Sequence, residues 1–119
     1  MSKIVINGVD GNFGSLVAKY ALELMNKEDL VFTAPKEESL KEYKEQGIQT
    51  AIANFNDPEG LVKVFENADK VLLISMPFVG EKRRQAHKNA VDACVKANVK
   101  LFIHLFYQQH IHLTQALKM

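Results

Sequence analysis

The chain has few of the features that mark secreted, membrane-bound or nucleic-acid-binding proteins. Its 119 residues include one cysteine, Cys94, so no disulfide can form within the chain, and we expect a reducing, cytoplasmic setting. We expect no secretory leader or membrane span, because the apolar residues 4–6 are followed at once by a glycine loop, and no run approaches the roughly 18 apolar residues of a span. A formal net charge of +1 predicts attraction neither to nucleic acid nor to an acidic membrane surface.

The composition indicates an ordinary globular domain. Hydrophobic residues make up 47% of the chain and charged residues 24%, and repeats, low-complexity segments and linkers are missing. We therefore expect a single domain over residues 1–119, which is small for a complete dinucleotide-dependent enzyme.

Short apolar runs alternate with amphipathic segments along the chain, and this alternation predicts an α/β fold built from parallel βα units. We expect about five strands, at residues 4–6, 30–33, 48–53, 70–75 and 99–105. Four helices are expected between them, at residues 13–25, 37–46, 58–68 and 81–97, on both faces of the sheet and with right-handed crossovers. No residues remain for further strands, so the sheet is expected to be incomplete at its C-terminal side.

Local signals indicate how these helices begin, end and pack. Asp57 can cap free N–H groups and Pro58 suits a first helical position, whereas Gly47 suits a left-handed helix end. The first helix is expected to bury a stripe at helical spacing, comprising Phe13, Leu16, Val17, Tyr20, Ala21, Leu24 and Met25. The fourth helix is expected to pack closely through small residues, namely Ala86, Ala90, Ala93, Cys94 and Ala97. In that stripe Cys94 is interpreted as a core residue and not as an activated thiol.

The loop after the first strand carries three glycines, Gly8, Gly11 and Gly14, with the spacing G-x-x-G-x-x-G. The first permits a tight turn, the second lets the backbone approach a pyrophosphate, and the third lets helix and strand pack closely. Free N–H groups at the helix start would then hold the phosphates. This pattern predicts a Rossmann-type NAD(P)-binding domain; the alternative is a plain turn without a ligand. Asp10 would repel a pyrophosphate unless its carboxylate points outward.

The end of the second strand indicates which cofactor is preferred. NAD-binding folds usually place an acid about 20 residues beyond the glycine loop, where it binds the ribose 2′-hydroxyl. The present chain has no acid before Glu37, and Lys36 with the Thr33 hydroxyl could instead meet a 2′-phosphate. We therefore predict a weak preference for NADP over NAD, with a solvated Lys36 as the alternative.

Two further strand ends are expected to line the cofactor cleft, because ligands in open α/β sheets bind outside the carboxyl ends of the strands. Asn54 and Phe55 follow the third strand and could contact the adenine, or serve only as a turn residue and a core aromatic. Ser75 and Met76 follow the fourth strand and are also assigned to the cofactor site.

These segments resemble the NmrA-like group of atypical short-chain dehydrogenases, which includes NAD(P)H:quinone oxidoreductase-like proteins. The likeness lies in residues 4–14, 47–57, 68–77 and 80–100 and extends over about residues 3 to 103. The last segment is the most specific, with Glu81-Lys82-Arg83 leading into His87-Lys88-Asn89-Ala90. Members of this group are more than twice as long as the present chain.

The resemblance implies an NADP-binding Rossmann domain that contacts its cofactor through Gly8, Gly11, Asn12, Phe13, Gly14, the second-strand end, Asn54, Phe55, Ser75 and Met76. It also implies hydride transfer from NADPH to a quinone-like or other small carbonyl acceptor. Two alternatives are a non-enzymatic NAD(P)-sensing regulator and an inactive fragment. Residues 106–119 do not match the group, and we interpret them as an atypical tail from a truncated or frame-shifted product. A homodimer through the exposed edge of the sheet is a further expectation.

Other residues that suggest chemistry are assigned no role. A tyrosine–lysine pair four residues apart would be needed for the usual short-chain dehydrogenase mechanism, and Tyr20, Tyr43 and Tyr107 are each followed at that spacing by another residue. His110 and His112 lack the cysteine or acid that would complete a zinc site, so no metal is expected. No catalytic residue is therefore named.

Overall fold

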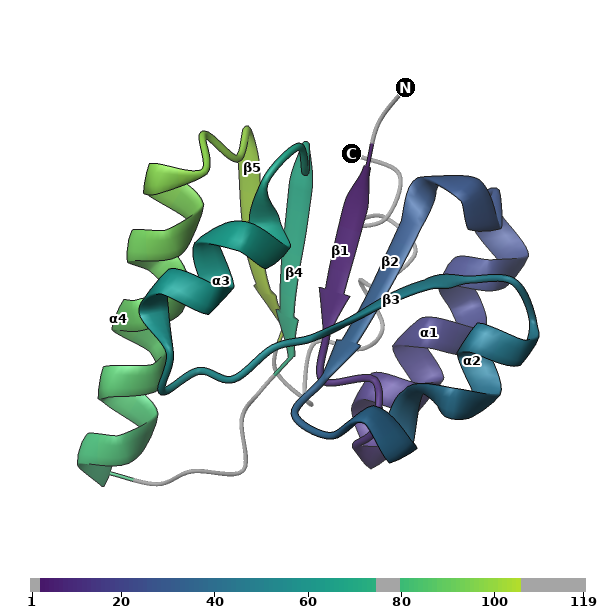
Figure 1. Cartoon of the computed structure of the whole chain (residues 1–119), viewed down its shortest axis with the longest axis horizontal. Coiled ribbons are helices and arrows are strands. Elements are labelled where there is room, and N and C mark those ends of the chain that lie inside the picture. Colours follow the sequence, from purple (N-terminus) through teal and green to yellow (C-terminus); the bar gives the residue numbers. More distant parts are fainter. Residues whose placement is uncertain (1–2, 75–79, 106–119) are drawn as a thin grey trace.

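The computed structural model describes residues 3–74 and 80–105, which form a single parallel sheet with helices on both sides (Figure 1). The strands lie in the order β3-β2-β1-β4-β5, and every neighbouring pair is parallel. Their bounds are Ile4–Asn7 for β1, Leu30–Ala34 for β2, Gln49–Ile52 for β3, Lys70–Ile74 for β4 and Leu101–Leu105 for β5. The predicted five-stranded, Rossmann-like α/β fold is confirmed.

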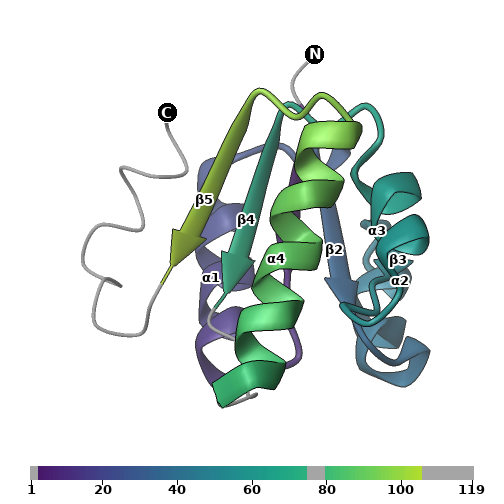
Figure 2. The same cartoon turned by 90° about the vertical axis from the view of Figure 1, so that its left-hand side faces the viewer.

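The helices form two layers on opposite faces of this sheet. One layer holds α1 (Asn12–Leu24) and α2 (Lys41–Glu45), and the other holds α3 (Pro58–Phe65) and α4 (Gly80–Lys96) (Figures 1 and 2). Two short 3-10 turns, η1 (Lys27–Asp29) and η2 (Glu37–Leu40), precede β2 and α2. In the described part of the chain, no helix is long and apolar enough to cross a membrane.

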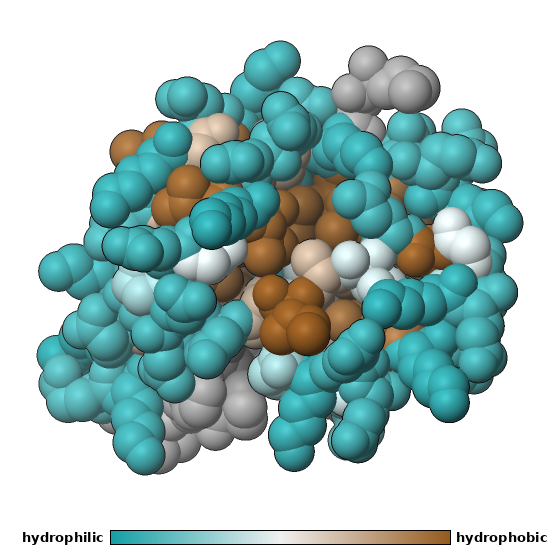
Figure 3. Space-filling model, in the orientation of Figure 1, coloured by the Kyte–Doolittle hydropathy of each residue, from teal (hydrophilic) through white to brown (hydrophobic). Residues whose placement is uncertain are grey.

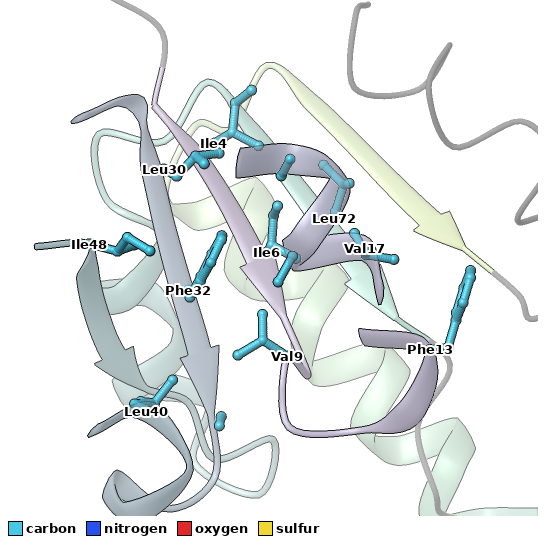
Figure 4. Close-up of a cluster of buried hydrophobic side chains, with 13 residues drawn as sticks. Ile4, Ile6, Val9, Phe13, Val17, Leu30, Phe32, Leu40, Ile48 and Leu72 are labelled. Atoms are coloured by element: carbon cyan, nitrogen blue, oxygen red, sulfur yellow. The ribbon is translucent and has the colours of Figure 1, made fainter. Parts of the chain in front are cut away.

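The core is divided between the two faces because successive side chains of a strand point to opposite sides. All four residues of β1 are buried. Ile4 and Ile6 pack toward α1 in one cluster (Figure 4), whereas Val5 packs in a second cluster with Leu61 and Phe65 of α3. A central parallel strand is covered on both faces, which is why β1 is apolar at each of residues 4–6.

Helix α1 lies on the sheet through a narrower surface than its sequence predicts. Leu16, Tyr20 and Leu24 are exposed by 40%, 41% and 40%, so their assignment to the buried stripe was wrong. The buried residues of α1 are Phe13, Gly14, Val17, Ala18 and Ala21. Small residues at three of these positions let the helix axis approach the sheet closely, and this approach decides which flank is covered.

The elements between β2 and α3 follow most of the local signals. The single helix predicted over residues 37–46 is instead the 3-10 turn η2 followed by the short α2. Gly47 has a φ of +83°, as expected for a left-handed helix end. The Asp57 side chain accepts a hydrogen bond from the Gly60 N–H over 3.2 Å, and Pro58 is the first residue of α3, so the predicted cap is confirmed.

Strand β3 forms one edge of the described sheet and carries apolar surface. Ile52 is exposed by 52%. In Figure 3 apolar side chains gather in the middle of the view, over the region where Figure 1 draws β3 crossing in front of the other elements.

Candidate functional site: the glycine loop and neighbouring strand ends

The loop between β1 and α1 is held against the end of β2 by its own backbone. The N–H groups of Gly8 and Val9 both donate to the Thr33 carbonyl, over 3.1 and 3.2 Å, and the Gly11 N–H donates to the Gly8 carbonyl over 3.2 Å. Gly8 has a φ of +79°, a conformation that disfavours residues with a Cβ atom. These bonds fix a tight turn at the carboxyl end of β1.

The three glycines of the loop have different surroundings. A Cβ atom built on Gly14 would lie 1.7 Å from the Gly8 carbonyl oxygen, so the helix can pack against the strand end only if residue 14 is glycine. A Cβ atom on Gly11 would lie 3.7 Å from that oxygen, which is an ordinary contact. The structure therefore supports the close-packing role predicted for Gly14 and leaves room in front of Gly11.

The beginning of α1 offers backbone donors and positive potential. Gly11 occupies the N-cap position and, as a glycine, has no side chain with which to cap the helix. Gly11 and Asn12 are exposed, while the Phe13 side chain packs in the core. The first N–H groups of a helix lack acceptors within the helix, and its dipole is positive at this end, so the geometry suits a pyrophosphate.

A buried polar pair forms the floor beneath this loop. Asn7 and Thr33 are exposed by 1% and 0%. The Thr33 hydroxyl donates to Asn7 Oδ1 over 2.6 Å, and Asn7 Nδ2 donates to the Leu72 carbonyl over 3.1 Å. The ends of β2, β1 and β4 are thereby joined. Asn7 was not among the residues predicted from the sequence, although a polar residue at the end of a buried strand is a usable signal.

Thr33 and Lys36 were both predicted to meet a 2′-phosphate, but they differ in accessibility. The Thr33 hydroxyl is buried and already donates to Asn7, so a phosphate contact would require that bond to open. Lys36 is exposed and immediately precedes η2, two residues after β2 ends at Ala34. Of the two residues, Lys36 is the one whose side chain is accessible at this edge of the sheet.

Asp10, which was expected to repel a pyrophosphate unless its carboxylate points outward, is exposed. It also acts on a neighbouring element. Burial raises the pKa of Tyr43, and the negative charges of Glu42 and then Asp10 raise it further. The charge of Asp10 therefore reaches Tyr43 in α2.

The loop after β3 has the arrangement of a turn residue followed by a core aromatic. Asn54 is exposed, and its Oδ1 accepts a hydrogen bond from the Asn56 N–H over 2.9 Å. Phe55 is half-buried and packs against the clusters beneath α3 and α4. Its carbonyl accepts from Asn89 Nδ2 over 2.7 Å, so α4 holds this loop in place through a residue that the sequence analysis did not assign to the site.

The remaining predicted features fall into two groups. Ser75, Met76 and the histidines at 110 and 112 lie outside the described residues. Cys94 is buried, and burial raises the pKa of its thiol to about 12, as expected for a core residue. The described part of the chain contains no cluster of three or more histidine, cysteine or acidic residues that could hold a metal ion.

Comparison with known proteins extends these observations. A family model described as NAD(P)H-binding matches residues 8–108, which begins at the first glycine of the loop. Quinone oxidoreductase 2 of Escherichia coli is 28% identical over 97 residues, covering 82% of this chain and 34% of that protein. An NmrA-like family domain-containing oxidoreductase of Aspergillus flavus, flvB, is 24% identical over 108 residues, covering 88% of this chain and 34% of that protein. These relatives confirm the resemblance found in the sequence, and the chain spans about a third of their length.

Solved structures show the same fold. The structure of the Escherichia coli quinone oxidoreductase in complex with NADPH superimposes with a TM-score of 0.81 and 25% identity, covering 97% of this chain and 44% of that one. The triphenylmethane reductase of Citrobacter sp. in complex with NADP(H) gives a TM-score of 0.83 and 24% identity, covering 98% of this chain and 45% of that one.

Proposed function

The chain belongs to the NAD(P)H-binding family, and on this premise we propose that it binds NADPH at the glycine loop as the cofactor-binding part of a quinone-reductase-like oxidoreductase. The observation that carries the proposal is the approach of α1 to the end of β1, where a Cβ atom on Gly14 would lie 1.7 Å from the Gly8 carbonyl oxygen. This close approach brings the beginning of the helix against the carboxyl end of β1, where ligands of open α/β sheets bind.

The residues present fit a dinucleotide. The backbone around Gly11 and Asn12 would hold the pyrophosphate, since this segment is exposed and begins a helix of 13 residues. The adenosine ribose would lie beside the end of β2, near Lys36, as it does in folds of this type. The Asn7–Thr33 pair would keep the loop in shape without touching the cofactor.

The preference for NADP and the acceptor are finer parts of the proposal. Lys36 supports NADP, because an exposed ammonium group beside the ribose can pair with a 2′-phosphate. Two of the structural neighbours are described as complexes with NADP(H) or NADPH. A quinone acceptor is supported by the quinone oxidoreductase among the relatives. The nicotinamide would supply the hydride, and the protein would supply binding and orientation.

The proposal is tested by two measurements on the full chain. NADPH and NADH are titrated while cofactor fluorescence is followed, and we expect saturable binding of both with NADPH the tighter. A quinone is then added, and the absorbance of the reduced nicotinamide is expected to fall. Binding without turnover would favour the alternative of a cofactor-sensing protein, and the absence of binding would overturn the proposal. The variant Gly14→Ala serves as the control that should bind neither cofactor.

A further inference from the structure

An acidic side chain lies on the glycine loop at the place where the loop meets the end of β2. The Val9 N–H donates to the Thr33 carbonyl over 3.2 Å, and the Val9 side chain is buried in the cluster that contains Phe32 and Leu40 (Figure 4). Because Val9 is anchored in this way, the next residue, the exposed Asp10, is held next to the carboxyl end of β2.

The electrostatic effect of Asp10 agrees with this placement. The ring of Tyr43 in α2 packs edge-on against Phe32 of β2, with 4.9 Å between ring centroids. Asp10 is one of the negative groups that raise the pKa of Tyr43, after burial and Glu42. Asp10 therefore lies close enough for its charge to act on Tyr43, which packs beside β2, the strand whose carboxyl end holds the adenosine ribose of a dinucleotide in folds of this type.

The charges around that ribose position are not neutralised by one another. Lys36 is exposed at the turn into η2, and in the part of the chain that the structure describes neither Lys36 nor Asp10 takes part in an ion pair. The adjacent Glu37 is paired with Lys44 over 3.2 Å. A bound ribose would thus meet a free base from the strand end and a free acid from the loop.

We propose that Asp10 is a specificity-determining residue for the adenosine ribose, whose carboxylate disfavours a 2′-phosphate and accepts a hydrogen bond from a free 2′-hydroxyl. In NAD-binding folds an acid at the end of β2 has this function. In the present chain the acid comes from the glycine loop and opposes Lys36, which weakens the preference for NADP. This inference rests on the proposed binding of NAD(P)H at the loop.

The test compares two nucleotides that differ only in the 2′-phosphate, namely 5′-AMP and adenosine 2′,5′-bisphosphate, by calorimetry on the full chain. Asp10→Asn is expected to tighten binding of the bisphosphate about three- to tenfold and to leave 5′-AMP unchanged or slightly weaker, since one like charge near the phosphate is removed. At high salt, Asp10→Asn should tighten binding of the bisphosphate by a smaller factor, because salt screens the charge that the substitution removes. NADPH and NADH should follow the same pattern.

Two control variants separate a local effect from a change in net charge. Glu66→Gln removes one exposed acid after α3, on the opposite face of the sheet, and should leave the ratio of the two affinities unchanged. Lys36→Gln should change the ratio in the opposite direction, by weakening only the 2′-phosphorylated ligands. Asp10 is exposed, so thermal unfolding of Asp10→Asn should match that of the wild type.

The outcomes distinguish this inference from the function on which it rests. If the wild type binds none of the four nucleotides, the proposed function fails and the inference fails with it. If the wild type binds them but Asp10→Asn leaves the ratio unchanged, or shifts both ligands equally, only the role of Asp10 is overturned. A selective gain for the 2′-phosphorylated ligands in Asp10→Asn, absent in Glu66→Gln, supports it.

Discussion

The Thr33 hydroxyl donates a hydrogen bond to Asn7 Oδ1 over 2.6 Å, and both side chains are buried where β1 and β2 end. The carbonyl of the same Thr33 accepts the N–H groups of Gly8 and Val9. Thr33 therefore joins the buried floor of the site to the loop above it, through its side chain on one side and its backbone on the other.

Thr33→Val should destabilise the protein and weaken NADPH binding. The substitution leaves Asn7 Oδ1 buried without its donor, which costs about 1–3 kcal/mol of unfolding free energy in urea denaturation. Thr33→Ser keeps the hydroxyl, so its unfolding free energy should fall clearly less than that of Thr33→Val. The matched control Thr50→Val lies on the half-buried β3, where we expect little change in cofactor affinity. Equal losses for the valine and serine variants would contradict a role for the hydroxyl.

Alanine substitutions at two loop glycines should have opposite outcomes. Gly14→Ala places a methyl group 1.7 Å from the Gly8 carbonyl oxygen, so the helix must move and stability should fall by at least about 1–3 kcal/mol. Gly11→Ala meets that oxygen only at 3.7 Å and should fold normally. Thermal unfolding measures the difference. If Gly14→Ala melted like the wild type, the close approach of α1 to β1 would be wrong.

Asp57→Ala should destabilise α3 by removing its N-cap. The Asp57 side chain accepts a hydrogen bond from the Gly60 N–H, and loss of such a cap costs about 0.5–2 kcal/mol. Asp57→Asn retains an acceptor oxygen at the same place, so its unfolding free energy should fall much less. The unfolding free energies of the two variants are compared by denaturant unfolding. If Asp57→Ala and Asp57→Asn were equally stable, the Asp57 side chain would not act as the N-cap.

Cys94 should be inert in the native protein. Burial raises the pKa of its thiol to about 12, so the reactive thiolate is scarce at neutral pH, and a thiol reagent should label it only on unfolding. The native state holds this proton more tightly than the unfolded state does. Stability should therefore be unaffected below the ordinary thiol pKa of about 8.5 and should fall as the pH rises from there toward 12. Cys94→Ala should reduce this alkaline loss, and rapid labelling of the folded wild type would contradict the burial.

Two adjacent positions in α1 test which flank of the helix is buried. Leu16 is exposed by 40%, so Leu16→Gln should change the unfolding free energy by no more than about 0.5 kcal/mol. Val17 is fully buried, so Val17→Ala should cost about 1–3 kcal/mol through loss of packing. If the two variants lost similar amounts of unfolding free energy, Leu16 would be buried as the sequence predicts, and the narrower buried surface of α1 would be contradicted.

The elements of the fold were predictable because their signals are local. The run at residues 4–6 is apolar at every position, as a strand covered on both faces must be, and Asp57-Pro58 begins a helix by its own chemistry. The glycine loop was recognisable because Gly8 and Gly14 occupy positions that disfavour a Cβ atom, Gly8 through its positive φ and Gly14 through its contact with the Gly8 carbonyl oxygen. Each of these features depends on neighbours within a few residues along the chain.

Contacts between distant elements were decided only by the tertiary structure. Leu16, Tyr20 and Leu24 have helical spacing, but the close approach permitted by Gly14 and Ala18 turns another flank toward the sheet. The Asn7–Thr33 pair joins residues 26 apart, and the Asn89–Phe55 bond joins residues 34 apart. The sequence by itself determined that a glycine loop joins the first strand to the first helix. The order of the strands decided which side chains surround that loop, because residues remote in sequence meet only where parallel strands end side by side.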